Sequence, residues 1–148
     1  MICSQCWPFP CHYDLPGRDV TLNKILVVDD DLESRNLLCE VLEANGYAPY
    51  AVADGVAARE VLGRDHDYRI VIADFQMPHE SGLELLRKLR SENSTHAVVL
   101  MSSFMSAAEI KSAKALGVQA LLDKPFQIAE LLETVAGLSA QGSVQLSL

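Results

Sequence analysis

Acidic, hydroxyl and basic side chains follow short apolar segments at four separate places in this sequence. Residues 29–31 (DDD) follow ILVV, Asp74 follows YRIVIA, Ser102 follows AVVLM, and Lys124 comes shortly after ALL. Carboxylates gathered at one place repel one another, and a hard cation such as Mg²⁺, which prefers oxygen ligands, would neutralise them. A hydroxyl group and a lysine beside that cation would suit the oxygens of a phosphoryl group. A fold that brings these residues together would therefore form a site for phosphoryl chemistry.

The elements that would position these residues are short strands alternating with amphipathic helices. Strands are predicted at residues 25–28, 47–52, 68–73, 97–101 and 120–122. Helices are expected to begin at Leu32, at Val56, at Ser81 or Gly82, at Ala107 and at Gln127. Glycine signals at 46, 63 and 117 end three of the helices, and the last one is expected to end at Leu138.

Five such β/α units predict an α/β fold, with a doubly wound parallel five-stranded sheet and helices on both faces. Sheets of this kind bind ligands at the carboxyl ends of their strands. The acidic, hydroxyl and basic residues named above all stand at those ends. The fold class and the expected site chemistry therefore point to the same edge of the molecule.

The composition is that of a folded domain. Of the 148 residues, 49% are hydrophobic and 22% are charged, which argues against disordered and fibrous classes. The formal net charge of −8 repels phosphate backbones, so we expect no direct nucleic-acid binding. The sequence has no apolar run long enough for a membrane span, and its first residues do not have the pattern of a secretory signal. We therefore expect a cytoplasmic protein without membrane insertion.

The two ends of the sequence differ from the middle. Residues 1–22 contain three of the six prolines and no sustained apolar period, which predicts an irregular extension before a domain at 23–138. Residues 139–148 are expected to form a short tail, with no room for a C-terminal output domain. The extension also carries four residues of zinc-binding type, Cys3, Cys6, Cys11 and His12. The adjacent Cys11 and His12 would strain to reach one ion, so an irregular tail is the favoured interpretation.

Four segments of the sequence resemble the response-regulator receiver domains of two-component signalling. KILVVDDD at 24–31 is similar to the family's first strand and acidic pair, and ADFQMPHESG at 73–82 to its phosphoacceptor loop. VLMSS at 99–103 is similar to the segment with the family's switch hydroxyl, and LLDKPF at 121–126 to its lysine-proline motif. The resemblance covers about residues 23–138. It implies a flavodoxin-like, CheY-like fold with strand order 2-1-3-4-5.

The resemblance also implies a role for each residue of the expected site. Asp74 would accept a phosphoryl group from a histidine kinase or a phosphotransfer protein. Lys124 would neutralise the phosphoryl oxygens, and Ser102 would donate a hydrogen bond to one of them. The ligands of Mg²⁺ would be the carboxylates of Asp29, Asp30 and Asp74 and the backbone carbonyl of Gln76. The peptide bond before Pro125 would be cis, which proline permits.

The implied output is binding. Phosphorylation would change the affinity of a surface around the last two helices for a downstream protein target, and a phosphorylation-dependent homodimer stays open. The protein would be a signalling domain, not an enzyme, and would catalyse only its own phosphorylation and dephosphorylation. Because the sequence offers no output domain, the signal is expected to leave through binding.

Two positions depart from the family pattern, and two others bear on how long a phosphoryl group would persist. Leu121 stands where many members have an aromatic switch residue, and Ser81 stands where many have an acidic or amide residue. Serine caps helices well, so the second change affects little. Gln76 and Phe104 flank the path of the hydrolytic water in receivers. The apolar Phe104 should hinder water, so slow self-dephosphorylation is expected.

A different class of protein shares part of the first motif. VVDDDLE has the DxD spacing of a haloacid dehalogenase-type phosphatase, with Asp29 as nucleophile and Asp31 as acid. Glu33 stands where that family has threonine or valine, and the sequence has no segment for a cap domain. Asp31 is better explained as a helix cap. The residue that takes up phosphate distinguishes the two hypotheses.

Overall fold

The computed structural model describes residues 24–145, with side chains described as far as Ser139. Its elements, in chain order, are β1 (Lys24–Val28), α1 (Leu32–Ala44), β2 (Ala48–Val52), α2 (Gly55–Arg64), β3 (Ile70–Asp74), α3 (Gly82–Ser91), β4 (Ala97–Ser102), α4 (Ala107–Ala115), β5 (Ala120–Asp123) and α5 (Ile128–Gln145). The five strands are parallel, in the order β2-β1-β3-β4-β5. The predicted α/β fold and strand order are thereby confirmed. The N-terminal extension and its candidate zinc ligands lie outside the described residues.

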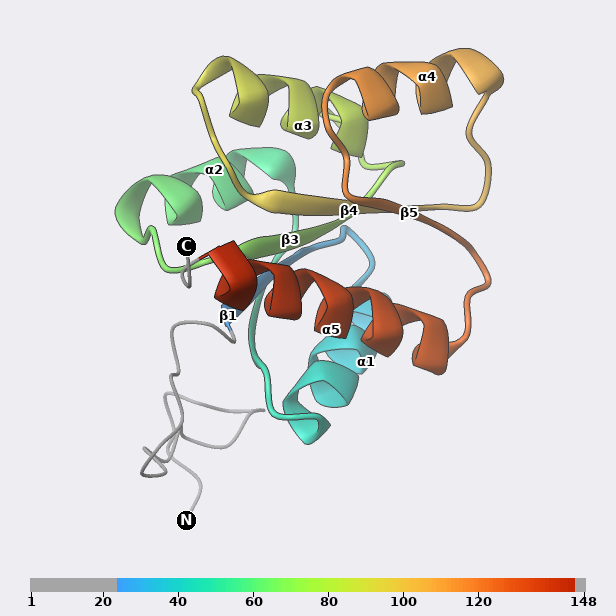
Figure 1. Ribbon diagram of the computed structural model, residues 1–148. Helices are drawn as coiled ribbons and strands as arrows, with labels where there is room; N and C mark the ends of the chain where they lie inside the picture. The colour runs from blue at the N-terminus through green and yellow to red at the C-terminus, as the bar shows by residue number, and fades with distance from the viewer. Residues whose placement is uncertain (1–23, 146–148) are drawn as a thin grey trace.

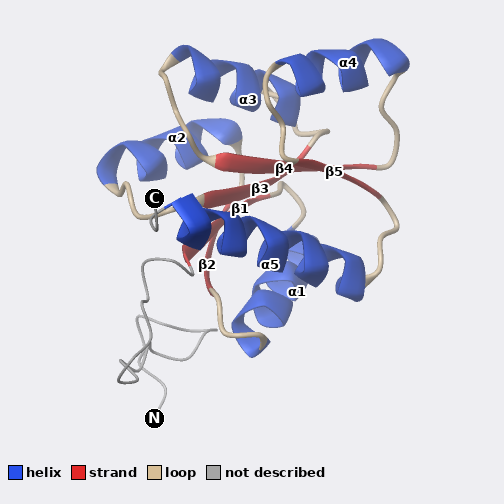
Figure 2. Ribbon diagram, viewed as in Figure 1, coloured by secondary structure: helices blue, strands red, loops and turns tan. Residues whose placement is uncertain are grey.

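Helices cover both faces of the sheet. In Figures 1 and 2, α2, α3 and α4 lie on one side of the strands, and α1 and α5 lie on the other. Alternate strand residues face the two layers: Leu26 and Val28 of β1 belong to the cluster under α2, α3 and α4, whereas Ile25 and Val27 belong to the cluster under α1 and α5. All four side chains are fully buried. Burial on both faces explains why the strand is a continuous apolar run.

Local signals in the sequence set most helix ends. The Asp31 side chain caps α1 by accepting the Ser34 N–H, and Ser81 forms a capping box with Glu84 at the start of α3. Gly46 and Gly117, with φ of +90° and +77°, follow the last turns of α1 and α4. The expected caps at residues 31 and 81 and the expected stops at 46 and 117 are therefore confirmed.

Two helix ends differ from the prediction. Helix α2 continues through Gly63 to Arg64, because Gly63 does not adopt the positive φ that ends a helix. Helix α5 continues to Gln145, seven residues past Leu138, since no glycine or proline stop follows Leu138 directly. Strand β3 also starts at Ile70, two residues later than expected.

The Lys124–Pro125 peptide bond is cis, as predicted. None of the helices within residues 24–145 is both long enough and apolar enough to cross a membrane.

The glycines at 82 and 63 provide a test of this packing. A Cβ on Gly82 would lie 2.6 Å from the Asp74 carbonyl oxygen, a backbone atom that cannot turn away. We predict that Gly82→Ala lowers the free energy of unfolding by about 1–3 kcal/mol, measured by urea denaturation. Nothing lies within 4 Å of a Cβ at Gly63, so Gly63→Ala should raise stability by up to about 1 kcal/mol. A stable Gly82→Ala protein would contradict the close approach.

Candidate functional site

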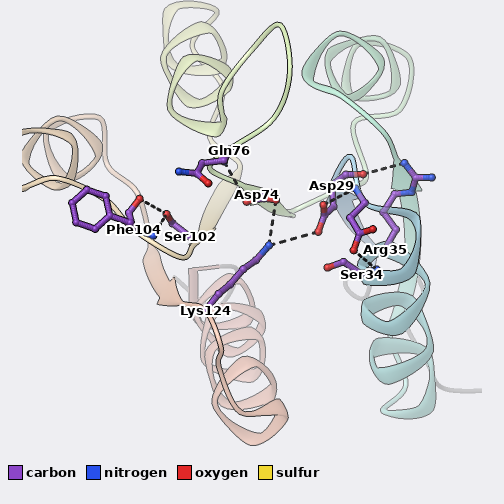
Figure 3. A network of polar contacts seen from close by, with 9 residues as sticks. Asp29, Ser34, Arg35, Asp74, Gln76, Ser102, Phe104 and Lys124 are labelled. Atoms are coloured by element: carbon purple, nitrogen blue, oxygen red, sulfur yellow. Dashed lines mark hydrogen bonds and ion pairs between the residues drawn. The ribbon is translucent and has the colours of Figure 1, made fainter.

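Three aspartates meet at the carboxyl edge of the sheet (Figure 3 labels two of them). Asp29 follows β1 and is 0% exposed, Asp74 ends β3 and is 8% exposed, and Asp30 is exposed on the turn after β1. One carboxylate oxygen from each lies within 4.8 Å of the others. Strands β1 and β3 are direct neighbours in the sheet, which explains why residues 45 positions apart along the chain come together.

Lys124 brings a positive charge to this cluster. Its Nζ lies 3.2 Å from Asp74 Oδ2 and 4.0 Å from Asp29 Oδ2. The lysine belongs to the loop after β5, and its backbone N–H donates to the Ser102 carbonyl at 2.8 Å, which ties that loop to the end of β4. The fold therefore brings together the lysine and the carboxylates that the sequence proposed.

Burial raises the pKa of Asp74 above its ordinary value. The nearby charge of Asp29 acts in the same direction, because two carboxylates resist being ionised side by side. Lys124 and the Gln76 backbone N–H, which donates to Asp74 Oδ1 at 3.2 Å, oppose the rise. The protein alone therefore only partly compensates the negative charge at this edge.

Asp29 supplies a direct test of whether the cluster suits a cation. Its Oδ1 accepts the Asp31 backbone N–H at 3.0 Å, which orients the carboxylate. Its Oδ2 is shielded from water and has no hydrogen-bond partner among the described residues. A buried carboxylate oxygen without a partner costs free energy, and a cation would satisfy it. The donor atoms are all oxygens, so the site fits Mg²⁺.

Arg35 is a residue of this site that the sequence did not single out. From α1, its Nη1 donates to the Asp29 backbone carbonyl at 3.0 Å and so holds the turn that carries the acidic pair (Figure 3). Its position, one turn into the helix that follows the acidic segment, is a sequence feature that places it near the expected site. Its partner is a main-chain oxygen, however, and side-chain spacing cannot identify such a partner.

Ser102 lies at the edge, but its hydroxyl group is occupied. The residue is 2% exposed, and its Oγ donates to the Phe104 carbonyl at 2.7 Å and accepts the Phe104 N–H at 3.0 Å. Figure 3 shows these two bonds on the side of Ser102 away from Asp74. The serine therefore has the expected place in the fold, while its hydroxyl holds the start of the β4–α4 loop.

This fold and this arrangement of carboxylates, hydroxyl and lysine define a class of signalling domain. The family model of the response regulator receiver domain matches residues 25–136, and the chain belongs to this family. Receiver domains typically bind Mg²⁺ at an acidic cluster like the one at residues 29, 30 and 74. Family membership leaves the haloacid dehalogenase-type alternative without support.

Individual relatives agree with this assignment. The chain is 36% identical over 115 residues to response regulator MprA of Mycobacterium leprae, covering 78% of this chain and 50% of that protein. It is 30% identical over 112 residues to sporulation initiation phosphotransferase F of Bacillus subtilis, covering 76% and 90% of the two chains. The chain thus spans about half the length of the MprA protein and most of the length of phosphotransferase F.

Solved structures show the same fold. A response regulator receiver protein from Pseudomonas putida is 30% identical with a TM-score of 0.74, covering 77% of this chain and 95% of that one. The receiver domain of the Francisella response regulator 1452 is 30% identical with a TM-score of 0.75, covering 81% and 98%. The fold comparison and the sequence comparison therefore lead to the same family.

The repulsion in the acidic cluster predicts a stability change. Asp74→Asn removes one of the two buried carboxylates of this cluster, so it should raise the free energy of unfolding in metal-free buffer by about 1 kcal/mol. Added Mg²⁺ should stabilise the wild-type protein and stabilise Asp74→Asn less, because binding to the folded state shifts unfolding by mass action. Denaturant titrations with and without Mg²⁺ measure both effects. The exposed Asp67→Asn is the matched control, and a less stable metal-free Asp74→Asn would contradict the argument.

Proposed function

We propose that this protein is a phosphorelay response regulator whose Asp74 accepts a phosphoryl group from a phosphohistidine of a histidine kinase or phosphotransfer protein. The observation that carries this proposal is the acidic cluster with the Lys124 Nζ 3.2 Å from Asp74 Oδ2. The proposed ligands of Mg²⁺ are the carboxylates of Asp29, Asp30 and Asp74 and the backbone carbonyl of Gln76. Membership in the receiver family supports these roles. It also supports a location in the cytoplasm.

The contacts of Asp74 suggest how transfer proceeds. Its two oxygens have different partners, Lys124 at Oδ2 and the Gln76 N–H at Oδ1. An Asp74 oxygen attacks phosphorus, the bond to the donor histidine nitrogen breaks, and an acyl phosphate forms. Lys124 favours the ionised form of Asp74 before attack and would pair with the phosphoryl oxygens afterwards. Mg²⁺, when bound, neutralises charge on the phosphoryl group.

The contacts of Ser102 suggest how the phosphoryl group is sensed. To donate to a phosphoryl oxygen, the Ser102 hydroxyl must leave the Phe104 carbonyl, and a change of χ1 that carries Oγ towards Asp74 also breaks the bond from the Phe104 N–H. Both bonds tie the β4–α4 loop to the sheet, so their loss would free the start of α4. Leu121 packs against the core cluster under α2, α3 and α4, and no aromatic ring takes part at this position. We propose that the loop carries the signal to a downstream protein or a second copy of the chain.

The position of the phosphoryl group tests the proposed function. Incubation with Mg²⁺ and a small acyl phosphate should add one phosphoryl group, and mass spectrometry of the peptides should place it on Asp74. Asp74→Asn should remain unmodified, while the exposed Asp67→Asn should be modified like the wild type. Phosphate at Asp29 in the Asp74→Asn protein would overturn the receiver mechanism.

The lifetime of the phosphoryl group is a separate prediction. We propose slow self-dephosphorylation, because the apolar Phe104 offers no group to orient water. Phe104 is 71% exposed, and its ring points away from Asp74 in Figure 3, so the ring would reach the water path when the loop moves with Ser102. Phe104→Glu should speed the decay of phosphorylated protein up to about tenfold, because a carboxylate can orient water. Phe104→Leu is the apolar control, and equal or slower decay in Phe104→Glu would count against this role.

A further inference from the structure

Glu80 is a buried carboxylate in the loop between β3 and α3. It is 5% exposed and lies six residues after the proposed phosphoacceptor. The pattern of the sequence predicts no role for it. Its Oε1 lies 2.9 Å from Lys88 Nζ on α3, and its Oε2 lies 3.6 Å from Arg59 Nη2 on α2. Among the described residues neither oxygen has a well-directed hydrogen bond, so these two cations supply the compensation that a buried charge requires.

The backbone of the loop is bent so that Glu80 can enter. His79 has a φ of +72°, which side chains other than glycine rarely adopt, and the Glu80 N–H donates to the Pro78 carbonyl at 2.8 Å. Together these features describe a γ-turn of the strained, positive-φ kind. Strained turns of this type persist only where the surrounding contacts hold them. The ion pairs of Glu80 are contacts of that kind.

The first turn of α2 is also shaped for this carboxylate. A Cβ on Gly55 would lie 2.4 Å from Glu80 Oε2, so a larger residue at position 55 would require the carboxylate to shift from this position. Gly55 is the first residue of α2, where the helix dipole favours a negative charge. Helices α2 and α3 therefore hold Glu80 from two sides.

The same loop carries the residue proposed to complete the metal site. It leaves the sheet at Asp74 and closes on itself where the Gly82 N–H donates to the Phe75 carbonyl at 2.9 Å. Between these points Gln76 is exposed, Met77 packs against the core, and Glu80 is buried. Anchoring at Met77 and Glu80 thus limits how far the main chain at Gln76 can move.

We propose that Glu80 is a positioning residue for the metal site. Through its ion pairs with Arg59 and Lys88 it holds the phosphoacceptor loop in the conformation that presents the Gln76 carbonyl to the cation. The inference rests on the proposed function of the site, because it assumes that the carbonyl is a ligand. Arg59 on α2 and Lys88 on α3, which lie outside the acidic cluster, would thereby also support the metal site.

Glu80→Gln tests this role, because it keeps the size of the side chain and removes its charge. We expect the dissociation constant for Mg²⁺, measured by calorimetric titration, to rise by about tenfold, as in proteins whose metal ligands lose their supporting contacts. Amide hydrogen exchange of residues 75–82 in metal-free protein should become faster, while exchange of the β4 amides stays unchanged. The exposed Glu60→Gln on α2 is the matched control with the same change of net charge.

Arg59→Gln tests the same role from the other side, because it removes the ion pair between α2 and Glu80 and leaves the loop sequence unchanged. It should raise the Mg²⁺ dissociation constant and speed loop exchange in the same direction as Glu80→Gln. Unchanged Mg²⁺ affinity and loop exchange in folded Glu80→Gln and Arg59→Gln proteins would overturn the inference. That result would not count against phosphorylation at Asp74. The proposed function itself would be overturned by a wild-type protein that takes up no phosphate at Asp74.

Discussion

Electrostatic repulsion between the carboxylates at the carboxyl edge of the sheet is the constraint on which the rest of the site depends. Asp29 and Asp74 are both buried and close together, and burial already raises the pKa of Asp74. Lys124 compensates part of this charge, while one oxygen of Asp29 is left without a hydrogen-bond partner. An edge that is short of positive charge favours a cation, and in the proposed function the bound cation would let a phosphoryl group approach. Under that proposal, the free energy that the fold gives up here would be recovered when the cation binds.

The two apolar layers make that cost tolerable. Strands β1 and β3 are buried on both faces, between α2, α3 and α4 on one side and α1 and α5 on the other. A rigid pair of central strands holds the two aspartates at their ends close together despite the repulsion. Arg35 and Asp31 add local support, the first through the Asp29 carbonyl and the second as the cap of α1. The polar edge is therefore positioned mainly by apolar packing.

The loops around the edge differ in how they are held, and this difference suggests a division of roles. The β4–α4 loop is tied by two hydrogen bonds through the Ser102 hydroxyl, for which a phosphoryl oxygen would compete in the proposed function. The β3–α3 loop is instead tied by the buried ion pairs of Glu80 and by apolar packing of Met77. A loop held by one hydroxyl suits a response to phosphorylation, whereas a loop held by buried charge suits the unchanging side of the site.

The sequence by itself determined the alternation of strands and helices, the strand ends that carry Asp29, Asp74, Ser102 and Lys124, and the caps at α1 and α3. These features depend on apolar periodicity and on hydrogen bonds between neighbouring residues, which a linear pattern records. The end of α2 was predicted wrongly, because a glycine ends a helix only if its φ becomes positive. The contacts of Arg35 with a main-chain oxygen and of Glu80 with two helices were decided by the tertiary structure. They join a side chain to a backbone atom whose position depends on the fold, or to charges on separate helices, and sequence spacing carries no information about such distances.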